Sequence, residues 1–458
     1  MARRLAYPLA LACVLALALA LAAEASAEVR SYTFRVGPIS VKEYSAKRNG
    51  EYVKAPRVDG YVTYMDATVV DAAGQPIPLS QVMPHHIVFK DMSYRGGPRR
   101  PDAACPHAAS DQRFYGTSEE LRPMTFPDGY GYRVNRRDRW KMGWMLMNHT
   151  HERRTAYIQY RVKVDTAKLT PVTPYWFSVL GCGIDPAYSV PGGGDAGSVS
   201  TRAFTARVPR AGRIVAVGGH LHGGSHDISL TQPRCGKRTL VTSRPTYGQP
   251  DDPVYQVTPL LHEPDPLNLT WWQSATGIPV KRGEKLRVSA RYRNDFPYMR
   301  VMGIVHVYIA HGKAAAGSGA AGCAPLPSDA QTLGPDFVGR DAPPHMELTL
   351  ARMGDDGRAH AWDGPGPPTT EYAGNASIKE SGYSFKPANF TIDAGKSVVW
   401  RFGDRDLHDA TLLDGPRGFS SPPMWGGTFR QRFDVPGKYK IYCSLHPVEM
   451  QQVLEVLP

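Results

Sequence analysis

The chain reads YCSLHPVEM over residues 442–450, close to the end of the sequence. The stretch holds a cysteine, a histidine three residues later and a methionine four residues after that. A trigonal copper site needs a thiolate and two imidazoles, with a weak thioether on its axis, and a short loop after a strand can supply three of these groups. We therefore predict that Cys443, His446 and Met450 bind one copper ion and that a second imidazole comes from upstream.

His408 is the candidate for the second imidazole. It follows residues 398–402, where apolar side chains alternate onto one face as in a β-strand. The segment that leads to Cys443 alternates in the same way after a Pro-Gly turn at residues 436–437. Met424 is expected to be a packing residue and not a ligand.

Residues 372–458 resemble a cupredoxin, the blue-copper β-sandwich of plastocyanin and pseudoazurin. The resemblance implies a Greek-key β-sandwich that holds a type 1 copper for electron transfer. It also implies the ligand set His408, Cys443, His446 and Met450. The three-residue gap between His446 and Met450 differs from the gap in several family members, and this departure concerns the axial ligand only.

The N-terminus has the order of a secretory signal peptide. Arg3 and Arg4 precede an apolar run over residues 9–23, and the small residues 25–27 follow it. We expect cleavage after Ala27 and export, either by secretion or to the periplasm or cell envelope. No second stretch is long and apolar enough to span a bilayer, so we expect no membrane span in the mature chain.

Length and composition favour several β-rich domains. The sequence has 458 residues, and domains typically contain about 100–200. Its 40 prolines and 45 glycines are spread between short β-like runs, which argues for an all-β chain. The formal charge is +12, but the basic residues are scattered and no aromatic-basic module accompanies them. We therefore expect a solvated basic surface and no nucleic-acid partner.

Four cysteines remain once Cys13 of the proposed signal peptide and Cys443 are set aside. An even number in an exported protein predicts two disulfides, for which the sequence permits three connectivities. We favour Cys105–Cys182 and Cys235–Cys323, because each pair would then close within one proposed domain.

Residues 313–371 separate the cupredoxin-like segment from the rest of the chain. They include KAAAGSG at 313–319 and GPGPP at 364–368, a composition that builds little core. We expect an irregular, flexible connector with some ordered patches.

Histidines recur upstream of this connector. His85 and His86 are adjacent, so in a regular strand they would point to opposite faces. Both could bind one ion only at a strand end or an irregularity, which Pro84 makes plausible. A later strand-like segment ends in His149 and His151, which share a strand face.

A second group of candidates lies between residues 212 and 312. The sequence GHLHG at 219–223 ends an alternating segment, and the period of two places His220 and His222 on one face, where both could reach one metal. Met302 and His306 share a face of a later strand-like segment. Alternative ligands, each of which could instead be a hydrogen-bonded core histidine, are His226, His262 and His306.

In this order, the His-His pair, single His, His-x-His pair and Met resemble the two-copper, ascorbate-dependent monooxygenases, namely peptidylglycine α-hydroxylating monooxygenase and dopamine β-monooxygenase. The stress-up-regulated nodulin-type proteins of plants look similar around residues 219–223. The resemblance covers roughly residues 29–312 and implies two jelly-roll-type β-sandwiches, which we place at 28–199 and 200–312. It implies an electron-storing copper and a catalytic, oxygen-activating copper, with O2 as cosubstrate and ascorbate as a candidate reductant. The implied ligands are His85, His86 and His149 for the first copper, and His220, His222 and Met302 for the second.

One departure concerns the substrate. Peptide-amidating members hold the substrate carboxylate with an Arg, an Asn and a Tyr, and this chain has Gly218, Ile304 and His306 at those positions. A glycine-extended peptide is therefore a poor substrate candidate, and the small-molecule substrate stays unidentified.

The sequence thus predicts an exported copper oxidoreductase, a monooxygenase-like enzyme with a fused blue-copper electron-transfer domain. The alternative is a non-enzymatic electron carrier whose N-terminal sandwiches are a degenerate scaffold or a module for binding a redox partner protein. Uptake of O2 by the reduced, copper-loaded chain separates the two hypotheses.

Overall fold

The computed structural model describes residues 28–93, 112–181, 185–311, 323–346, 348–403 and 405–458. Within these ranges the chain consists of strands and loops, with two short 3-10 helices, η1 (Pro233–Cys235) and η2 (Pro253–Gln256). The predicted all-β fold class is confirmed. None of the helices in these ranges has the length and apolar character needed to cross a bilayer. The proposed signal peptide and the proposed Cys105–Cys182 disulfide lie outside the described residues, so both stay predictions.

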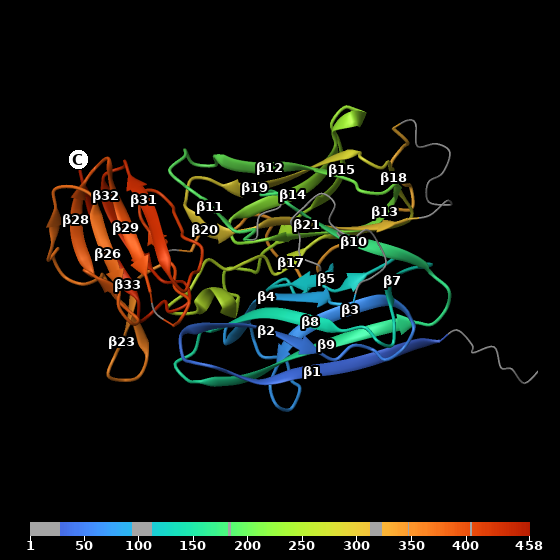
Figure 1. Ribbon diagram of the computed structural model, residues 1–458, viewed down its shortest axis with the longest axis horizontal. Coiled ribbons are helices and arrows are strands. Elements are labelled where there is room, and N and C mark those ends of the chain that lie inside the picture. The colour runs from blue at the N-terminus through green and yellow to red at the C-terminus, as the bar shows by residue number, and fades with distance from the viewer. Residues whose placement is uncertain (1–27, 94–111, 182–184, 312–322, 347, 404) are drawn as a thin grey trace, which may run out of the picture.

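The first sandwich is formed by the N-terminal strands, blue to green in Figure 1. A four-stranded sheet in the order β2-β8-β4-β5 packs on one half of a longer sheet, which here runs β1-β9-β3-β7 with β6 beside β3. Alternate residues of β9 are buried, as expected for a strand with one solvated face, and the core also buries Phe89, Phe114 and Trp140. The strands are β1 (Val29–Val41), β2 (Ser45–Val53), β3 (Gly60–Val70), β4 (Val82–Asp91), β5 (Gln112–Thr117), β6 (Met124–Thr125), β7 (Tyr130–Val134), β8 (Trp140–Asn148) and β9 (Arg154–Asp165).

The second sandwich shares the long sheet with the first. The sheet continues as β10-β21-β13-β18-β22, and a four-stranded sheet in the order β12-β19-β14-β15 covers this half. All residues of β21 are buried, since the strand lies in the middle of the sheet. The strands are β10 (Thr170–Ser178), β11 (Tyr188–Val190), β12 (Val199–Arg207), β13 (Gly212–Leu221), β14 (Ser225–Gln232), β15 (Arg238–Ser243), β16 (Pro245–Thr246), β17 (Asn268–Leu269), β18 (Trp271–Val280), β19 (Lys285–Arg293), β20 (Tyr298–Val301), β21 (Gly303–Ala310) and β22 (Gln331–Leu333).

The shared sheet bears on the proposed domain boundaries. Strand β10 pairs with β7 of the first sandwich and with β21 of the second, so backbone hydrogen bonds cross from one to the other. The two sandwiches are therefore joined by a sheet and not only packed together. The proposed boundary near residue 199 stays a prediction.

The described part of the connector is fastened to its neighbours at several points. The predicted Cys235–Cys323 disulfide is present, with 5.5 Å between its Cα atoms, and β22 extends the long sheet. Further on, β23 (Ala351–Met353) and β24 (Ala359–Ala361) form a hairpin, and its Ala351 and Ala359 enter the core of the C-terminal sandwich. The rest of the described connector is irregular.

The C-terminal sandwich, orange to red in Figure 1, consists of two sheets with the orders β25-β28-β33-β32-β30 and β27-β26-β29-β31. As the alternation predicts, Val398, Trp400 and Phe402 are all buried between the sheets. The strands are β25 (Glu371–Tyr372), β26 (Ala376–Glu380), β27 (Phe385–Lys386), β28 (Asn389–Asp393), β29 (Lys396–Phe402), β30 (Thr411–Asp414), β31 (Gly427–Phe433), β32 (Gly437–Tyr442) and β33 (Gln451–Leu457).

The C-terminal sandwich docks on the other two through the loop between β32 and β33. Leu445 and Val448 of this loop belong to a buried apolar cluster that also contains Met83 and Met147 of the first sandwich and Leu261 of the second. Full burial of such side chains stabilises by roughly 1.5–3 kcal/mol each, so the interface is a packed one. The loop that carries the candidate copper ligands is therefore also the docking surface.

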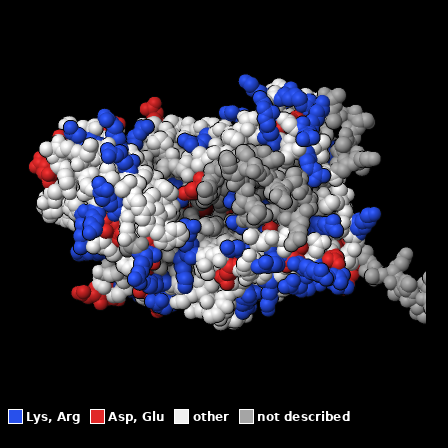
Figure 2. Space-filling view, viewed as in Figure 1, with Lys and Arg blue, Asp and Glu red and all other residues white. Residues whose placement is uncertain are grey.

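On the face seen in Figure 2, Lys and Arg side chains lie at many separate places, with Asp and Glu among them and no single basic patch. This distribution agrees with the solvated basic surface expected from the sequence.

Candidate metal centres

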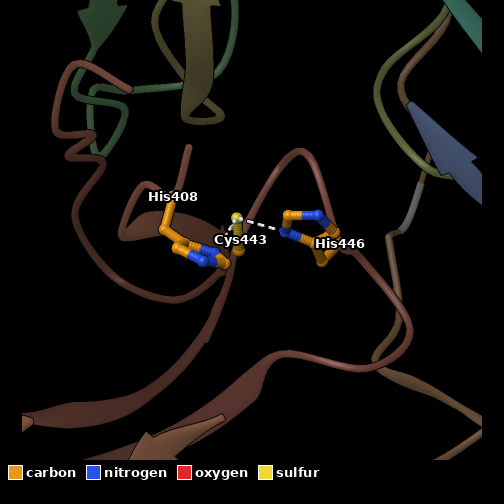
Figure 3. Close-up of side chains that lie close together, drawn as sticks. All are labelled: His408, Cys443 and His446. Carbon is orange, nitrogen blue, oxygen red and sulfur yellow. Dashed lines mark hydrogen bonds between the residues drawn. The ribbon is translucent and has the colours of Figure 1, made fainter. Parts of the chain in front are cut away.

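The C-terminal candidate centre is formed by three side chains from two loops (Figure 3). Cys443 and His446 follow β32, and His446 donates its backbone N–H to the Cys443 carbonyl at 3.1 Å. His408 follows β29, and its backbone exchanges two hydrogen bonds with Met424, of 3.1 and 2.9 Å. These backbone contacts hold both loops, so the three side chains meet at a defined place.

The spacing of the three side chains fits a central metal ion. The Cys443 sulfur lies 3.7 Å from Nδ1 of His446 and 4.0 Å from Nδ1 of His408. For metal bonds of about 2.0–2.3 Å at trigonal angles, a sulfur and a nitrogen ligand lie about 3.8 Å apart. The side chains are therefore nearly in ligand positions.

The surroundings of Cys443 also favour a bound cation. The residue is fully buried, and burial raises the pKa of its thiol, with the Asp409 carboxylate adding to the effect. The backbone N–H of Asp409 donates to the sulfur at 3.5 Å. Without a cation the thiol stays protonated, so formation of the thiolate here needs the positive charge of a metal.

Met450, the proposed axial ligand, closes the same loop. It is fully buried, its backbone N–H donates to the His446 carbonyl at 3.0 Å, and its carbonyl accepts from the Cys443 N–H at 2.9 Å. Met424 is half-buried and packs against the same core. The assignment of Met450 as the axial ligand stays a prediction.

A second group of candidates begins at an irregularity in β4. Pro84 pairs with Leu146 and His86 pairs with Met145, so one extra residue, His85, is inserted in β4. Such a bulge breaks the strict alternation of side chains. The rings of His85 and His86 lie 5.9 Å apart, so the adjacent pair shares one region as the sequence required.

His220 and His222 come from the end of β13. Their rings lie 5.0 Å apart, in agreement with the side chains sharing a face. Met302, between β20 and β21, lines the cavities next to His86, and its carbonyl accepts from the Tyr292 hydroxyl at 2.5 Å. Of the six candidate ligands upstream of residue 312, all but His149 thus line the space where the sandwiches meet.

The structure does not separate these histidines into the two ligand sets that the resemblance to the two-copper monooxygenases implies. His85 lies 5.2 Å from His222 and 5.2 Å from His262, while His149 lies 6.1 Å from His262, all between ring centres. The two expected ligand sets therefore adjoin within one cluster, and His262, named above only as an alternative, lies at its centre. The division of these residues between two copper ions stays a prediction.

Three carboxylates, none of which the sequence analysis singled out, face this cluster. Nδ1 of His220 lies 3.5 Å from Glu120, Nδ1 of His222 lies 3.2 Å from Asp265, and Nε2 of His262 lies 3.6 Å from Glu119, each measured to the nearest carboxylate oxygen. Ligand atoms of His85, Glu119 and His262, and likewise of His85, His222 and Asp265, lie within 4.8 Å of one another. Carboxylates at this distance either orient a metal-binding imidazole or bind the metal themselves.

The burial of these imidazoles favours their neutral form, which is the form that binds a metal. Burial lowers the pKa of both His86 and His149 to about 3, and Arg48 adds to the shift at His86. Nδ1 of His85, Nε2 of His222 and both ring nitrogens of His149 have no hydrogen-bond partner in the described structure. Buried polar atoms usually have partners, so neutral nitrogens left open beside one another fit a metal centre.

The other histidines have other surroundings. His306 on β21 stacks on Trp176, with 4.2 Å between ring centres, and lines a cleft beside His220. His226 on β14 is half-buried, with Arg291 and Asp227 as charged neighbours. His151 is half-buried next to Glu152.

A cavity of about 120 Å³ lies between the histidine cluster and the C-terminal ligand loop. Its lining includes His85, His222 and His262 of the cluster, Tyr442 at the end of β32 and Leu445 of the loop. The cluster and the residues next to Cys443 therefore border the same small space.

Comparisons with known proteins agree on the general class. No protein-family model matches the chain. A probable copper-dependent oxygenase of Cochliobolus lunatus is 25% identical over 252 residues, which cover 50% of this chain and 72% of that protein. A probable copper-dependent oxygenase of a Phoma species is 24% identical over 293 residues, 59% of this chain and 69% of that protein.

Among solved structures, a purple cupredoxin from Nitrosopumilus maritimus is 30% identical, with 18% of this chain and 98% of that chain covered and a TM-score of 0.16. An oxidized amicyanin variant is 16% identical, with 18% and 80% covered and a TM-score of 0.17.

The C-terminal centre yields a spectroscopic prediction. Cu(II) added to the purified chain should give an intense visible band, because a thiolate ligand donates charge to Cu(II). Cys443→Ser should abolish the band and leave copper at the other sites. Met424→Leu serves as the matched control, and a band that survives in Cys443→Ser would refute the assignment.

The buried histidines yield a pH prediction for the metal-free chain. Unfolded histidines bind protons near pH 6.5, but His149 in the folded state does so only near pH 3. The unfolded state therefore binds more protons between these values, and the free energy of unfolding falls as pH falls through this window. One such residue contributes about 1.4 kcal/mol per pH unit.

His149→Gln should reduce that slope by roughly this amount in urea titrations between pH 6 and pH 4, where the unfolded histidine is mostly protonated and the folded one is not. His151→Gln is the control, because it replaces a less buried imidazole two residues away, with 36% of its side chain exposed. An unchanged slope in His149→Gln would show that the buried imidazole does not set the pH dependence.

Proposed function

We propose that this protein is an exported copper oxidoreductase of the O2-dependent, monooxygenase-like type, and that its C-terminal centre delivers electrons to the histidine–carboxylate cluster. The observation that carries the proposal is the docking of the cysteine-containing ligand loop directly on that cluster. The similarity to proteins named probable copper-dependent oxygenases supports the same class.

The ligand types support copper at both places. One thiolate with two imidazoles suits a one-electron copper site, and an imidazole-rich set with a thioether nearby suits copper that visits the Cu(I) state. Copper bound at these centres would supply one-electron transfer and O2 chemistry, which protein side chains cannot perform.

The residues of the chain have separate tasks in this proposal. The carboxylates of Glu120 and Asp265 lie 3.5 and 3.2 Å from Nδ1 of His220 and His222, where they would orient those rings and leave Nε2 for a metal. Apolar side chains of the docked loop, such as Leu445, exclude bulk water from the cavity between the centres. A cavity shielded from bulk water limits side reactions of reduced oxygen species.

The docked geometry also offers a bonded route for electrons. Tyr442 is the chain neighbour of Cys443, and its hydroxyl donates to the Leu261 carbonyl at 3.3 Å. Leu261 is the chain neighbour of His262, the central imidazole of the cluster. The route from Cys443 to His262 therefore consists of covalent bonds and one hydrogen bond.

Copper content and O2 uptake test the function. The mature chain should bind three copper ions and, when reduced, consume O2 with a suitable organic donor. His222→Ala should bind less copper and lose O2 uptake while keeping the visible band of the C-terminal centre, because it removes an imidazole from the cluster only. His151→Ala is the control. A wild-type chain that binds one copper, or that binds three and consumes no O2, would favour the electron carrier.

The electron route has its own test. Tyr442→Phe removes the hydroxyl that contacts Leu261, so rapid mixing of the reduced, copper-loaded chain with O2 should show slower reappearance of the visible band. Tyr439→Phe is the matched control, because it removes a hydroxyl from the same strand whose hydrogen bond, of 2.8 Å, goes to Val435 instead. Equal rates in the two variants would exclude the route.

A further inference from the structure

A large cleft opens next to the histidine cluster. Its volume is about 590 Å³, and it lies between the β2-β8-β4-β5 sheet of the first sandwich and strands β10, β13 and β21 of the second. His86, His220 and Met302 line it, so the cleft reaches the residues that the proposed function makes catalytic. A cleft of this size accommodates a small organic molecule.

The charged residues around the cleft are mostly cationic. Arg48, Lys90, Arg113 and Arg300 line it, and Asp185 is the one acidic residue in the described lining. Asp185 is already bonded to Arg300 at 2.9 Å. Arg48 and Arg113 are exposed whereas His220 is buried, which places these guanidinium groups toward the solvent side of the cleft.

Buried polar atoms without partners occur on the same walls. Nε2 of His306 and Nε1 of Trp176 have no hydrogen-bond partner in the part of the chain that the structure describes, and His306 is only 3% exposed. Unpartnered polar atoms that line a cleft usually bond water or a ligand. The cleft therefore offers hydrogen-bonding groups in addition to positive charge.

The rest of the lining is small and apolar. Val88, Ile304, Pro422 and Pro423 contribute carbon surface, and Pro422 and Pro423 belong to the docked C-terminal sandwich. A side chain built at Gly143 would meet no atom within 4 Å, so this glycine leaves open space in the cleft. The cleft thus combines a cationic rim with an apolar interior.

We propose that the cleft binds the substrate, and that the substrate class is a small organic carboxylate with an apolar body. Arg48 and Arg113 hold the carboxylate through charge-assisted hydrogen bonds, and the apolar body extends toward His220 and Met302. That the bound carboxylate is a substrate rests on the proposed function. The binding site itself does not depend on bound copper.

The test compares an acid with its neutral isostere. Calorimetry on the copper-free full chain at low ionic strength, where exposed charges are least screened, should show 4-phenylbutanoate binding at least about tenfold more tightly than 4-phenylbutanamide. Arg48→Gln and Arg113→Gln should each weaken binding of the acid several-fold and leave binding of the amide unchanged. Arg430→Gln, on the exposed strand β31, is the control for loss of one positive charge.

A steric variant locates the site. Gly143→Phe fills open space and should abolish binding of both probes with an unchanged melting temperature. Equal affinity for acid and amide in the wild type, or wild-type binding by a folded Gly143→Phe, would overturn the proposal. If that variant does not fold, the two arginine variants decide.

The result for carboxylate binding can be distinguished from the result for the proposed function. A chain that binds the acid but takes up no O2 keeps the cleft and loses the oxygenase. A chain that takes up O2 and does not distinguish acid from amide loses the substrate class alone.

Discussion

The packing of the loop after β32 against the other two sandwiches is the contact on which the remaining features depend. The loop places Cys443 and His446 inside the C-terminal sandwich and turns Leu445 and Val448 outward into a shared apolar cluster with Met83 and Met147. Residues 443–450 therefore contribute both the candidate metal ligands and the apolar contacts of the interface.

This arrangement explains why the connector does not need to act as a loose tether. A flexible linker would raise the effective concentration of the electron donor, but it would not fix the distance between the two centres. The packed interface fixes that distance, and the Tyr442 hydroxyl bond to the Leu261 carbonyl adds a defined contact. The disulfide at Cys323 and strand β22 then fasten the start of the described connector to the second sandwich.

Local patterns in the sequence predicted the strands that lead to His408 and Cys443 and the proximity of Cys443 to His446, because these features depend on short-range order. Alternation predicted the strands before His408 and Cys443, and loop spacing predicted that Cys443 and His446 lie together. The place of His262 could not be predicted in this way. It lies in a loop with no strand pattern, and its neighbours His85 and His149 are more than 100 residues away in the chain, so only the tertiary fold brings them together. The same holds for the consecutive Glu119 and Glu120, which on sequence alone are indistinguishable from surface residues.

Arg300 shows how the second and C-terminal sandwiches are coupled at this junction. Its φ of 51° is in the left-handed region, which costs a non-glycine residue of order 1 kcal/mol and persists only where surrounding contacts compensate. Those contacts come from different parts of the fold, since its guanidinium bonds Asp185 and also the Ser421 carbonyl of the C-terminal sandwich at 3.0 Å. Arg300 lines both the small cavity and the cleft, and Met302 follows two residues later. The strained backbone at residue 300 is thus held by the docked sandwich, so docking positions not only the proposed electron donor but also the wall that carries Met302.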